Sequence, residues 1–484
     1  MHFSLDKGGK FAVMQGDLFE EIREHFSVKN TAAAFTKKYN PYVPDRQYAI
    51  TPTGRFDAPL FSEILKFIIT HHTGVKITAD ANFKEAAAPS KNIWQTKQGF
   101  SIDPYPLALE LRDYQADIVE KCLEVGRGTV VLATAGGKTI TMASLISRVA
   151  SFYTAESKFK CLLIVPDLGL VTQTFKDFID YKVPFTFSKW TGNDDLNLAS
   201  DVIIANAGIL QSECSNINWI DFVDLLVVDE VHKIRKGNKI SDLVKKIKTP
   251  CKFGFTGTMP EDLLDQWNII GKIGPILYER NSKALRTDKY IADVFCQIIE
   301  LNHKTLPVPV ENKMEAYRAE LDFIITSTFR NNLIAKLANN VNNNCLVLID
   351  FIKHGVTLEE TLKRECKDKQ VFFIQGSVEV DERERIKQLM ENSTNIVVVA
   401  VSKIFSTGIN IKNLHYIVFA GGGKAKIKVV QSIGRGLRLH HSKTRLTLFD
   451  IADNLKYGNR HAEKRQNLYE KESIPFSIKT IEEA

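Results

Sequence analysis

The sequence has no apolar run long enough to cross a membrane and no stretch ordered like a secretion signal. The longest apolar runs, such as Ile396 to Val401, are far shorter than a membrane span. Met1 to Phe26 does not follow the basic, apolar and small-residue order of a signal peptide. With 44% apolar and 25% charged residues, the composition is typical of a globular protein and not of a disordered one. We therefore expect an intracellular protein without membrane contact.

Cysteine is scarce, and its spacing argues against cross-links. The seven cysteines are scattered, odd in number and never spaced as Cys-x-x-Cys. This pattern favours neither a disulfide framework nor a zinc site. We expect reduced thiols that lie mostly in the core. Their positions are Cys122, Cys161, Cys214, Cys251, Cys296, Cys345 and Cys366.

Positive charge exceeds negative charge, and the excess is uneven. The whole chain has a net charge of +7, while residues 421–484 alone hold 13 Lys and Arg against 7 Asp and Glu. An anionic partner is the natural inference from such a segment. The alternative is a basic surface that only keeps the protein soluble. Charge alone does not distinguish the two interpretations, so the sequence motifs are needed.

The order of apolar segments predicts an α/β protein with two lobes in tandem. The first hundred residues have few apolar strands, and Ala86 to Ser90 resembles a linker. From Leu111, buried strands alternate with amphipathic helices, which is typical of parallel sheets covered by helices. The expected strands are 130–133, 161–165, 202–205, 225–228 and 253–256 in one lobe, and 345–349, 371–374, 396–401, 416–420 and 446–450 in the next.

A small-residue turn between an expected strand and an expected helix predicts a phosphate-binding loop. Small residues let backbone N–H groups close around phosphates at a helix N-terminus. Lys138 would pair with the phosphates, and Thr139 would ligate Mg²⁺. Leu132 stands where the usual pattern has its first glycine, so a glycine-rich turn without a ligand is the alternative. The loop residues are Thr134, Ala135, Gly136, Gly137, Lys138 and Thr139.

Two adjacent carboxylates end the apolar run Leu225 to Val228. Asp229 would hold Mg²⁺, and Glu230 would orient and deprotonate an attacking water. His232 would link this site to the loop Thr256, Gly257 and Thr258. An acidic strand end facing solvent is the alternative, but Lys138 upstream argues against it. Together the two motifs predict hydrolysis of a nucleoside triphosphate.

The ordered motif series resembles that of superfamily 2 helicases with a DExH box, and more narrowly the UvsW-type recombination and repair helicases of tailed phages. The resemblance extends from about Leu111 to Asp453. Its motifs are Arg112-Asp113-Tyr114-Gln115, the Lys138 loop, Leu163 to Pro166, Asp229-Glu230-Val231-His232, Thr256-Gly257-Thr258, Phe405 to Asn410 and Gln431 to Arg438.

The resemblance implies two RecA-like lobes, a small N-terminal α/β domain, and ATP with Mg²⁺ as cofactors. Arg112 and Gln115 would bind the nucleotide, with the Gln115 amide facing an adenine edge. In the second lobe, Arg435 and Arg438 would act as arginine fingers and Gln431 would place the water. Gly408 would let the backbone approach the nucleotide. A surface pair of arginines is the alternative for Arg435 and Arg438.

Nucleic acid would lie across both lobes, held through phosphates without reading sequence. Asn206 departs from the family, which usually has Thr there, and Lys353 with His354 could instead form a solvated turn. Lysines 424, 426 and 428 could carry charge to a backbone or protect an exposed edge. The candidates in the family's positions are Pro166, Gln173, Asn206, Gly208, Lys353, His354, Ser377, Ser406 and Thr407.

The resemblance also implies the domain order and the substrate. We expect an accessory DNA-engaging domain at 1–104, an ATP-binding lobe at 105–288, a second lobe at 289–460 and a tail packing on it at 461–484. Phe56 to Phe61 is the most distinctive stretch of the first domain, and its apolar residues favour a core over a strand-separating wedge.

The expected activity is that of an ATP-dependent DNA helicase or translocase, a monomer acting on forked or branched DNA independently of sequence. An RNA–DNA hybrid is a further candidate substrate. The alternatives are an RNA-directed helicase and a DNA-binding scaffold that has lost turnover. A phage-encoded member would work in the cytoplasm of an infected bacterial host.

Overall fold

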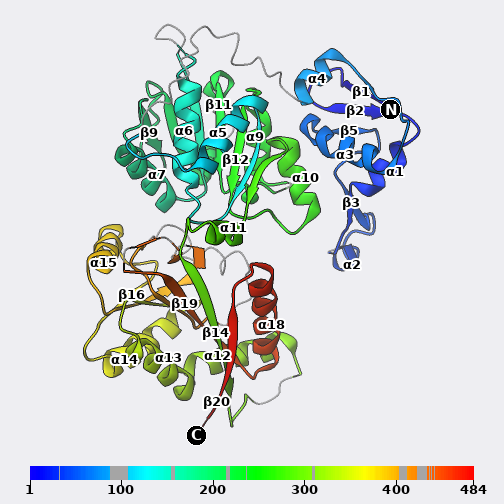
Figure 1. Cartoon of the computed structure of the whole chain (residues 1–484). Helices are drawn as coiled ribbons and strands as arrows, with labels where there is room; N and C mark the ends of the chain where they lie inside the picture. Colours follow the sequence, from blue (N-terminus) through cyan, green and yellow to red (C-terminus); the bar gives the residue numbers. More distant parts are fainter. Residues whose placement is uncertain are drawn as a thin grey trace. The chain divides into compact units, whose positions relative to one another are not determined.

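The computed structural model describes residues 1–31, 33–87, 107–153, 158–213, 218–235, 237–307, 311–402, 411–421, 433–434, 436–437, 439–440 and 442–483. Internal contacts divide the chain into two compact units. Unit 1 comprises residues 1–132 and 137–279, and unit 2 comprises residues 133–136 and 280–484. Each unit contains a seven-stranded sheet (Figure 1). The predicted fold class, two α/β lobes preceded by a small α/β domain, is confirmed.

The large sheet of unit 1 has the strand order β13-β7-β12-β11-β8-β10-β9, and the neighbours from β7 to β9 pair in parallel. Its strands are β7 (Gly128–Leu132), β8 (Cys161–Val165), β9 (Phe187–Trp190), β10 (Val202–Asn206), β11 (Leu225–Asp229), β12 (Lys252–Thr256) and β13 (Ile276–Arg280). Its helices are α5 (Asp113–Val125), α6 (Lys138–Ala150), α7 (Leu168–Tyr181), α8 (Ala207–Glu213), α9 (Lys239–Lys246) and α10 (Leu263–Lys272).

Burial explains why these segments form the central strands. Every residue of β7, β8 and β12 is buried, as is usual for a parallel sheet covered on both faces. The expected helical stripe from Tyr114 to Leu123 is the buried face of α5. Because β12 lies between β7 and β11, the carboxyl ends of three strands from distant parts of the sequence meet at one edge.

The N-terminal domain belongs to unit 1 and has a mixed sheet of its own, in the order β5-β2-β1-β6. Its elements are β1 (His2–Leu5), β2 (Ala12–Gln15), α1 (Phe19–His25), β3 (Ser27–Lys29), α2 (Ala33–Thr36), β4 (Arg46–Tyr48), β5 (Arg55–Phe56), η1 (Ala58–Leu60), α3 (Phe61–His71), β6 (Thr78–Ala79) and α4 (Ala81–Ala87). Phe56 and Leu60 are buried in its core, as predicted. The linker prediction is wrong for Ala86 and Ala87, because both lie in α4.

Helix α10 joins this domain to the large sheet. Leu264, Trp267 and Ile270 share one hydrophobic cluster with the N-terminal core, and Phe26 lies 5.1 Å from Trp267 between ring centroids. Asp57 pairs with Lys272 of the same helix and lies 3.5 Å from Lys245 Nζ. The domain is therefore packed on α10 through a shared core.

The sheet of unit 2 is parallel throughout, in the order β16-β17-β15-β18-β19-β14-β20. Its strands are β14 (Asp293–Asn302), β15 (Cys345–Ile349), β16 (Gln370–Ile374), β17 (Ile396–Val401), β18 (Tyr416–Phe419), β19 (Arg445–Asp453) and β20 (Phe476–Glu482). Its helices are α11 (Ser282–Thr287), α12 (Lys313–Thr326), α13 (Thr328–Asn340), α14 (Ile352–Glu365), α15 (Val380–Asn392) and α18 (Lys456–Lys471).

The last segment of the chain is part of this sheet. Strand β20 pairs with β14 along its whole length, and α18 is held by a buried network on β19. In that network Asp450 accepts hydrogen bonds from Arg465 and from the Tyr469 hydroxyl. The expected boundary between residues 460 and 461 thus falls inside α18, while the one near 104 lies outside the described residues.

The six cysteines in the described part of the chain are free and buried, as expected for core positions. Within the same ranges, no helix has both the length and the apolar character needed to span a bilayer. The described residues also contain no cluster of three or more His, Cys, Asp or Glu that could hold a metal ion.

Replacement of Trp267 by Ala tests the packing of the N-terminal domain on α10. We expect a loss of about 3 kcal/mol in local stability, because the indole is buried in the shared core. Hydrogen exchange of the β1 and β2 amides measures this loss. Leu263→Ala on the same helix is the control, because Leu263 is exposed. Equal protection in the two variants would contradict the shared core.

Candidate active site

The loop after β7 takes backbone conformations that few residues adopt. Ala135 has φ 67° and Gly137 has φ 85°, both in the left-handed region. A Cβ atom on Gly137 would collide with Gln115 Nε2, so glycine is required there for two reasons. Ala135 is not glycine and therefore carries backbone strain, which is typical of functional sites. Helix α6 begins at Lys138, and its first backbone N–H groups are available to an anion.

Gln115 is buried, and one end of its amide already has a partner. Its Oε1 atom accepts a hydrogen bond from the Arg112 N–H at 2.9 Å, which caps α5. The Arg112 guanidinium donates to the Tyr114 hydroxyl at 3.1 Å. The predicted contact of Gln115 with an adenine stays a prediction, but its packing against Gly137 connects α5 to the start of α6.

The two carboxylates lie at the end of β11, facing the start of α6. Glu230 has φ 51°, a second strained position at a non-glycine residue. Its Oε1 atom lies 3.7 Å from Lys138 Nζ, and the Glu230 N–H donates to Asp229 Oδ1 at 2.9 Å. The order of the strands in the sheet therefore brings the two predicted motifs together, the Lys138 loop and the pair Asp229 and Glu230.

The two carboxyl groups have opposite electrostatic environments. Burial and the neighbouring Glu230 raise the pKa of Asp229 above its ordinary value. Burial would also raise the pKa of Glu230, but Lys138 and His232 outweigh it and lower that pKa. Glu230 is thus held as a carboxylate, while the nearby charges of Lys138 and Lys233 only partly offset the raised pKa of Asp229. This donor set suits a hard divalent cation such as Mg²⁺.

His232 connects the carboxylate to the end of β12. Its Nδ1 atom lies 3.1 Å from Glu230 Oε2 and 2.8 Å from Thr256 Oγ1. The Thr256 hydroxyl also donates to the Thr258 carbonyl at 2.9 Å. These contacts form a continuous path from Glu230 to the loop at Gly257. A role for the path in coupling remains a prediction.

Four nucleic-acid candidates of unit 1 follow β8 and β10. Pro166 follows β8, and Gln173 on α7 donates to Asp177 at 2.7 Å. Asn206 ends β10 and accepts from the Gly208 N–H at 2.8 Å, which caps α8. Asn206, where the family usually has Thr, therefore still provides a side-chain oxygen that caps the helix. Contact with nucleic acid is a prediction for all four.

In unit 2, His354 differs from expectation. It lies in α14 with 1% of its surface exposed, and its Nε2 atom bonds Asn331 Oδ1 at 3.0 Å. A solvated turn and a direct phosphate contact both require an exposed imidazole, so both interpretations are wrong for His354. The sequence gives no signal for the Asn331 partner, which lies on α13. Lys353 and Ser377 are exposed and stay candidates.

Several predicted residues lie outside the described part of the chain. The roles of these residues stay predictions. They are Ser406, Thr407, Gly408, Lys424, Lys426, Lys428, Gln431, Arg435 and Arg438.

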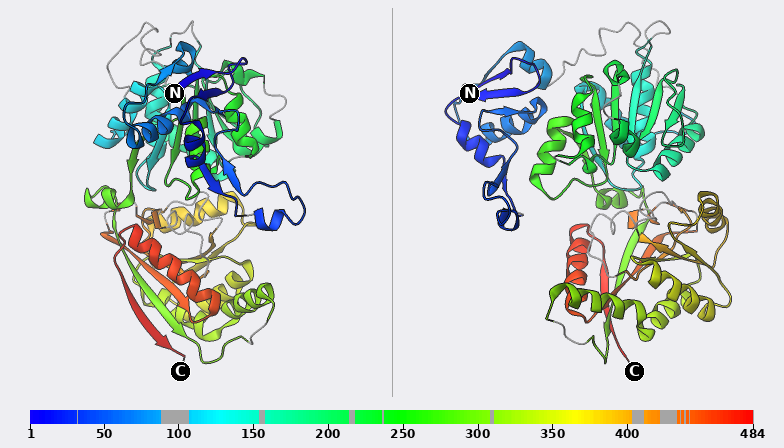
Figure 2. Two further views of the ribbon diagram at one scale, coloured as in Figure 1. Left: turned by 90° about the vertical axis from the view of Figure 1, so that its right-hand side faces the viewer. Right: turned by 180° about the vertical axis from the view of Figure 1, so that it is seen from behind.

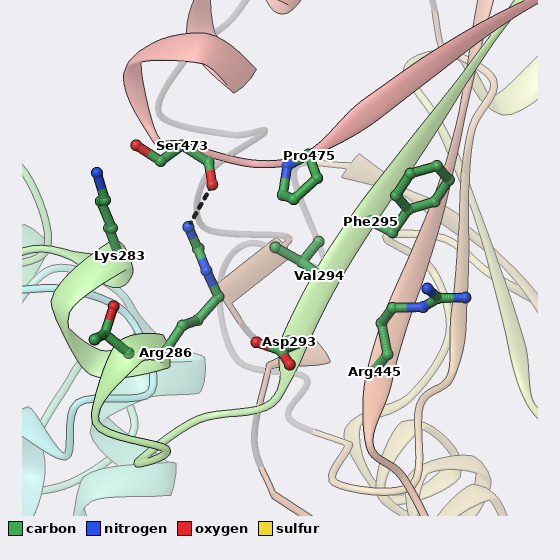
Figure 3. Close-up of a pocket in the computed structure, with 9 residues that line it drawn as sticks. Lys283, Arg286, Asp293, Val294, Phe295, Arg445, Ser473 and Pro475 are labelled. Atoms are coloured by element: carbon green, nitrogen blue, oxygen red, sulfur yellow. Dashed lines mark hydrogen bonds between the residues drawn. The ribbon is translucent and has the colours of Figure 1, made fainter.

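A cavity of about 500 Å³ lies elsewhere, within unit 2 (Figure 3). Its lining includes Lys283, Arg286 and Arg445, but none of the predicted site residues. Arg286 donates to the carbonyls of Glu472 and Ser473 at 2.8 and 3.0 Å. These hydrogen bonds connect α11 to the turn between α18 and β20. The cavity is therefore explained by the way in which these elements meet.

Comparisons with known proteins agree with this arrangement. Residues 108–261 match the family described as type III restriction enzyme, res subunit, and residues 328–440 match the helicase conserved C-terminal domain. The chain is 28% identical to the ATP-dependent DNA helicase uvsW of Enterobacteria phage T4, over 96% of this chain and 95% of that one.

Two further proteins are similar over most of the chain. The DNA 3'-5' translocase XPB2 of Sulfurisphaera tokodaii is 26% identical over 69% of this chain and 81% of its own. A fragment of the HsdR subunit of a type I restriction enzyme from Vibrio vulnificus shares the fold. It has a TM-score of 0.57, at 14% identity, and the match covers 81% of this chain and 71% of that one.

The buried His354 predicts a pH dependence of stability. Burial, followed by the nearby charge of Arg330, lowers the pKa of His354 to about 3. In the unfolded chain its pKa is about 6.5, so between these values only the unfolded chain binds the proton. Stability is therefore complete above about pH 6.5 and falls as the pH decreases, by about 2 kcal/mol at pH 5.

Urea unfolding at pH 8 and pH 5 measures this effect. We expect His354→Gln, whose amide can still donate to Asn331, to reduce the difference between the two pH values. The exposed His71, replaced in the same way, is the control. An unchanged difference in the His354 variant would show that the imidazole does not cause it.

Proposed function

Because the chain belongs to the superfamily 2 helicases, we propose that it hydrolyses ATP to move along branched DNA. The proposed substrates are forks, Holliday junctions and R-loops, and the proposed processes are recombination, repair and replication restart. Similarity to a phage DNA helicase over 96% of this chain supports DNA as the substrate. The basic segment 421–484 is consistent with an anionic partner.

The observation that carries the proposal is the partly buried ion pair between Lys138 and Glu230. A lysine at a helix N-terminus provides charge for the β- and γ-phosphates, and a carboxylate beside it can receive a proton from water. Both groups are largely shielded from solvent, which strengthens their electrostatic effect on a bound phosphate. A nucleotide hydrolase needs this combination.

Each residue of the site has a proposed part in hydrolysis. Lys138 and the first N–H groups of α6 bind the phosphates. Glu230 orients the attacking water and takes its proton, and His232 holds the Glu230 carboxylate in place. Mg²⁺, when bound, would be held by Thr139 and Asp229 and would supply positive charge to the phosphates.

The remaining roles rest on the family resemblance. Gln431, Arg435 and Arg438 of the second lobe would complete the site, with the arginines neutralising charge on the transferred phosphoryl group. Gly408 would approach the nucleotide. The four-part division of the chain, with a DNA-engaging domain before two lobes, is proposed in the same way. We also propose that the chain acts as a monomer.

Two substitutions at the site separate binding from catalysis. Lys138→Ala should abolish turnover and weaken ATP binding, because the ammonium compensates phosphate charge before and during reaction. Glu230→Gln should preserve ATP binding but reduce kcat by about 10²- to 10⁴-fold, since only proton transfer is lost. ATPase assays and nucleotide titrations measure the two effects. Glu124→Gln, on the exposed face of α5, is the control.

A substrate panel with the intact chain tests the proposed function. We expect DNA to stimulate ATPase, with affinity that falls steeply as salt rises because phosphate contacts release counterions. Forks and four-way junctions should be remodelled faster than blunt duplexes, and base sequence should matter little. Stimulation by RNA alone would favour an RNA-directed helicase. Turnover without stimulation by any nucleic acid would contradict the proposal.

A further inference from the structure

Lys443 of unit 2 is a buried cation that the proposed hydrolysis does not use. It lies two residues before β19, and 4% of its surface is exposed. Burial lowers the pKa of Lys443 to about 8, and no carboxylate among the described residues pairs with it. An ammonium buried without a carboxylate is costly and has to be stabilised by hydrogen bonds. What Lys443 does therefore depends on its hydrogen-bond partners.

The Lys443 ammonium bridges two segments of backbone. Its Nζ atom donates to the Gly436 carbonyl and to the Lys412 carbonyl, both at 2.7 Å. Gly436 belongs to the motif Gln431 to Arg438. Lys412 comes two residues after the motif Phe405 to Asn410. One side chain therefore connects the backbone of one motif to the segment that follows the other.

The backbone at Gly436 is packed closely on the sheet. A Cβ atom there would lie 2.8 Å from Leu446 Cδ2 and 3.4 Å from Ile417 Cδ1, which leaves room for glycine only. One residue later, the Leu437 carbonyl accepts a hydrogen bond from the Ala292 N–H at 2.7 Å. The Gly436 carbonyl is itself buried, so loss of its ammonium donor would be costly.

The turn that carries Lys443 is held in place by further contacts. The Ser442 hydroxyl donates to Asn413 Oδ1 at 3.2 Å, and His415 Nε2 lies 3.1 Å from the Ser442 carbonyl oxygen. The Lys443 N–H donates to the His440 carbonyl at 2.9 Å. These contacts fix the backbone from which the lysine side chain starts. The ammonium is therefore held at one place, as a positioning group has to be.

We propose that Lys443 is a positioning residue for ATP hydrolysis. Its ammonium fixes the Gly436 carbonyl, and with it the stretch of backbone to which Arg435 and Arg438 belong. An arginine finger acts only when its guanidinium reaches the developing charge, so a small displacement of its backbone reduces the rate. The inference rests on the proposed function, which gives the two arginines their part, since both lie outside the described residues.

The alternative is that Lys443 only stabilises the fold of unit 2, by satisfying carbonyls that would otherwise lack a donor. The two roles have different consequences. A residue that only stabilises the fold lowers the melting temperature when it is replaced, but the chains that remain folded turn over ATP at the normal rate. A positioning residue lowers the kcat of the folded chain.

The test measures ATPase of the full chain in the wild type, in Lys443→Met and in Lys443→Arg, below their melting temperatures and with saturating DNA. Methionine is of similar length but cannot donate, so kcat should fall by about 10- to 100-fold. Affinity for a non-hydrolysable ATP analogue should change by less than about twofold, because Lys138 and the start of α6 are unaltered. Arginine can donate to both carbonyls and should restore part of the turnover.

A double-mutant cycle tests whether Lys443 acts through the arginines. Single-turnover hydrolysis with excess enzyme is measured in Arg435→Ala with Arg438→Ala, with and without Lys443→Met. The factor lost on adding Lys443→Met should be much smaller than in the otherwise wild-type chain, since residues that act as a unit are not additive. An equal factor in both backgrounds would overturn the proposal.

Leu468→Ala is the matched control for stability. Leu468 is buried on α18, the red helix beside the sheet of unit 2 in Figure 2. Loss of its side chain should lower the melting temperature and leave the kcat of the folded chain near that of wild type. An equal loss of kcat in Leu468→Ala and Lys443→Met, or an unchanged kcat in Lys443→Met, would show that Lys443 has no positioning role. Absence of ATPase in the wild type would instead defeat the proposed function.

Discussion

A largely shielded carboxylate that must stay charged is the constraint on which the active site depends. Glu230 is shielded from water, and an isolated charge in that position would cost several kcal/mol. Lys138 on one side and His232 on the other stabilise it. Lys138 must therefore lie at the start of α6, within reach of Glu230. The strained backbone conformations of Ala135 and Glu230 are retained in the two segments that hold this ion pair. The rest of unit 1 keeps these groups in register.

Helix α10 extends this arrangement to the N-terminal domain. Asn268 on α10 donates to the Ile234 carbonyl at 3.3 Å, just after the short helix that contains His232. The preceding residue, Trp267, belongs to the N-terminal core. A single helix therefore contacts both the segment behind the carboxylates and the accessory domain.

The sequence predicted the central strands of the two large sheets well, and it predicted the edge strand β16 but not the edge strands β9, β13 and β20. Cys161–Val165, Cys345–Ile349 and Ile396–Val401 have the predicted bounds, because a strand buried on both faces is a continuous apolar run. Strands β13 and β20 were missed, since their residues are mostly exposed or only partly buried. Strand β14 has an alternating pattern that could have revealed it.

Within the site, the sequence identified the chemical groups but not their environment. The pairing of Lys138 with Glu230 followed from motif order, because β7, β12 and β11 lie side by side. The burial of His354 could not be predicted, since it depends on Asn331 from another helix and on the packing of α13 against α14. The antiparallel pair β3 and β4 was missed as well, because these strands are only three residues long and no apolar run marks them.

The position of β14 between β19 and β20 has a consequence for how the chain folds during synthesis. β14 starts at Asp293, but its two neighbours begin at Arg445 and Phe476. More than half of the second sheet can be translated while one of its longest strands still has both edges open. Such edges attract other strands. Unit 1 can fold as it emerges, whereas unit 2 needs protection from mispairing until Glu482 has been added.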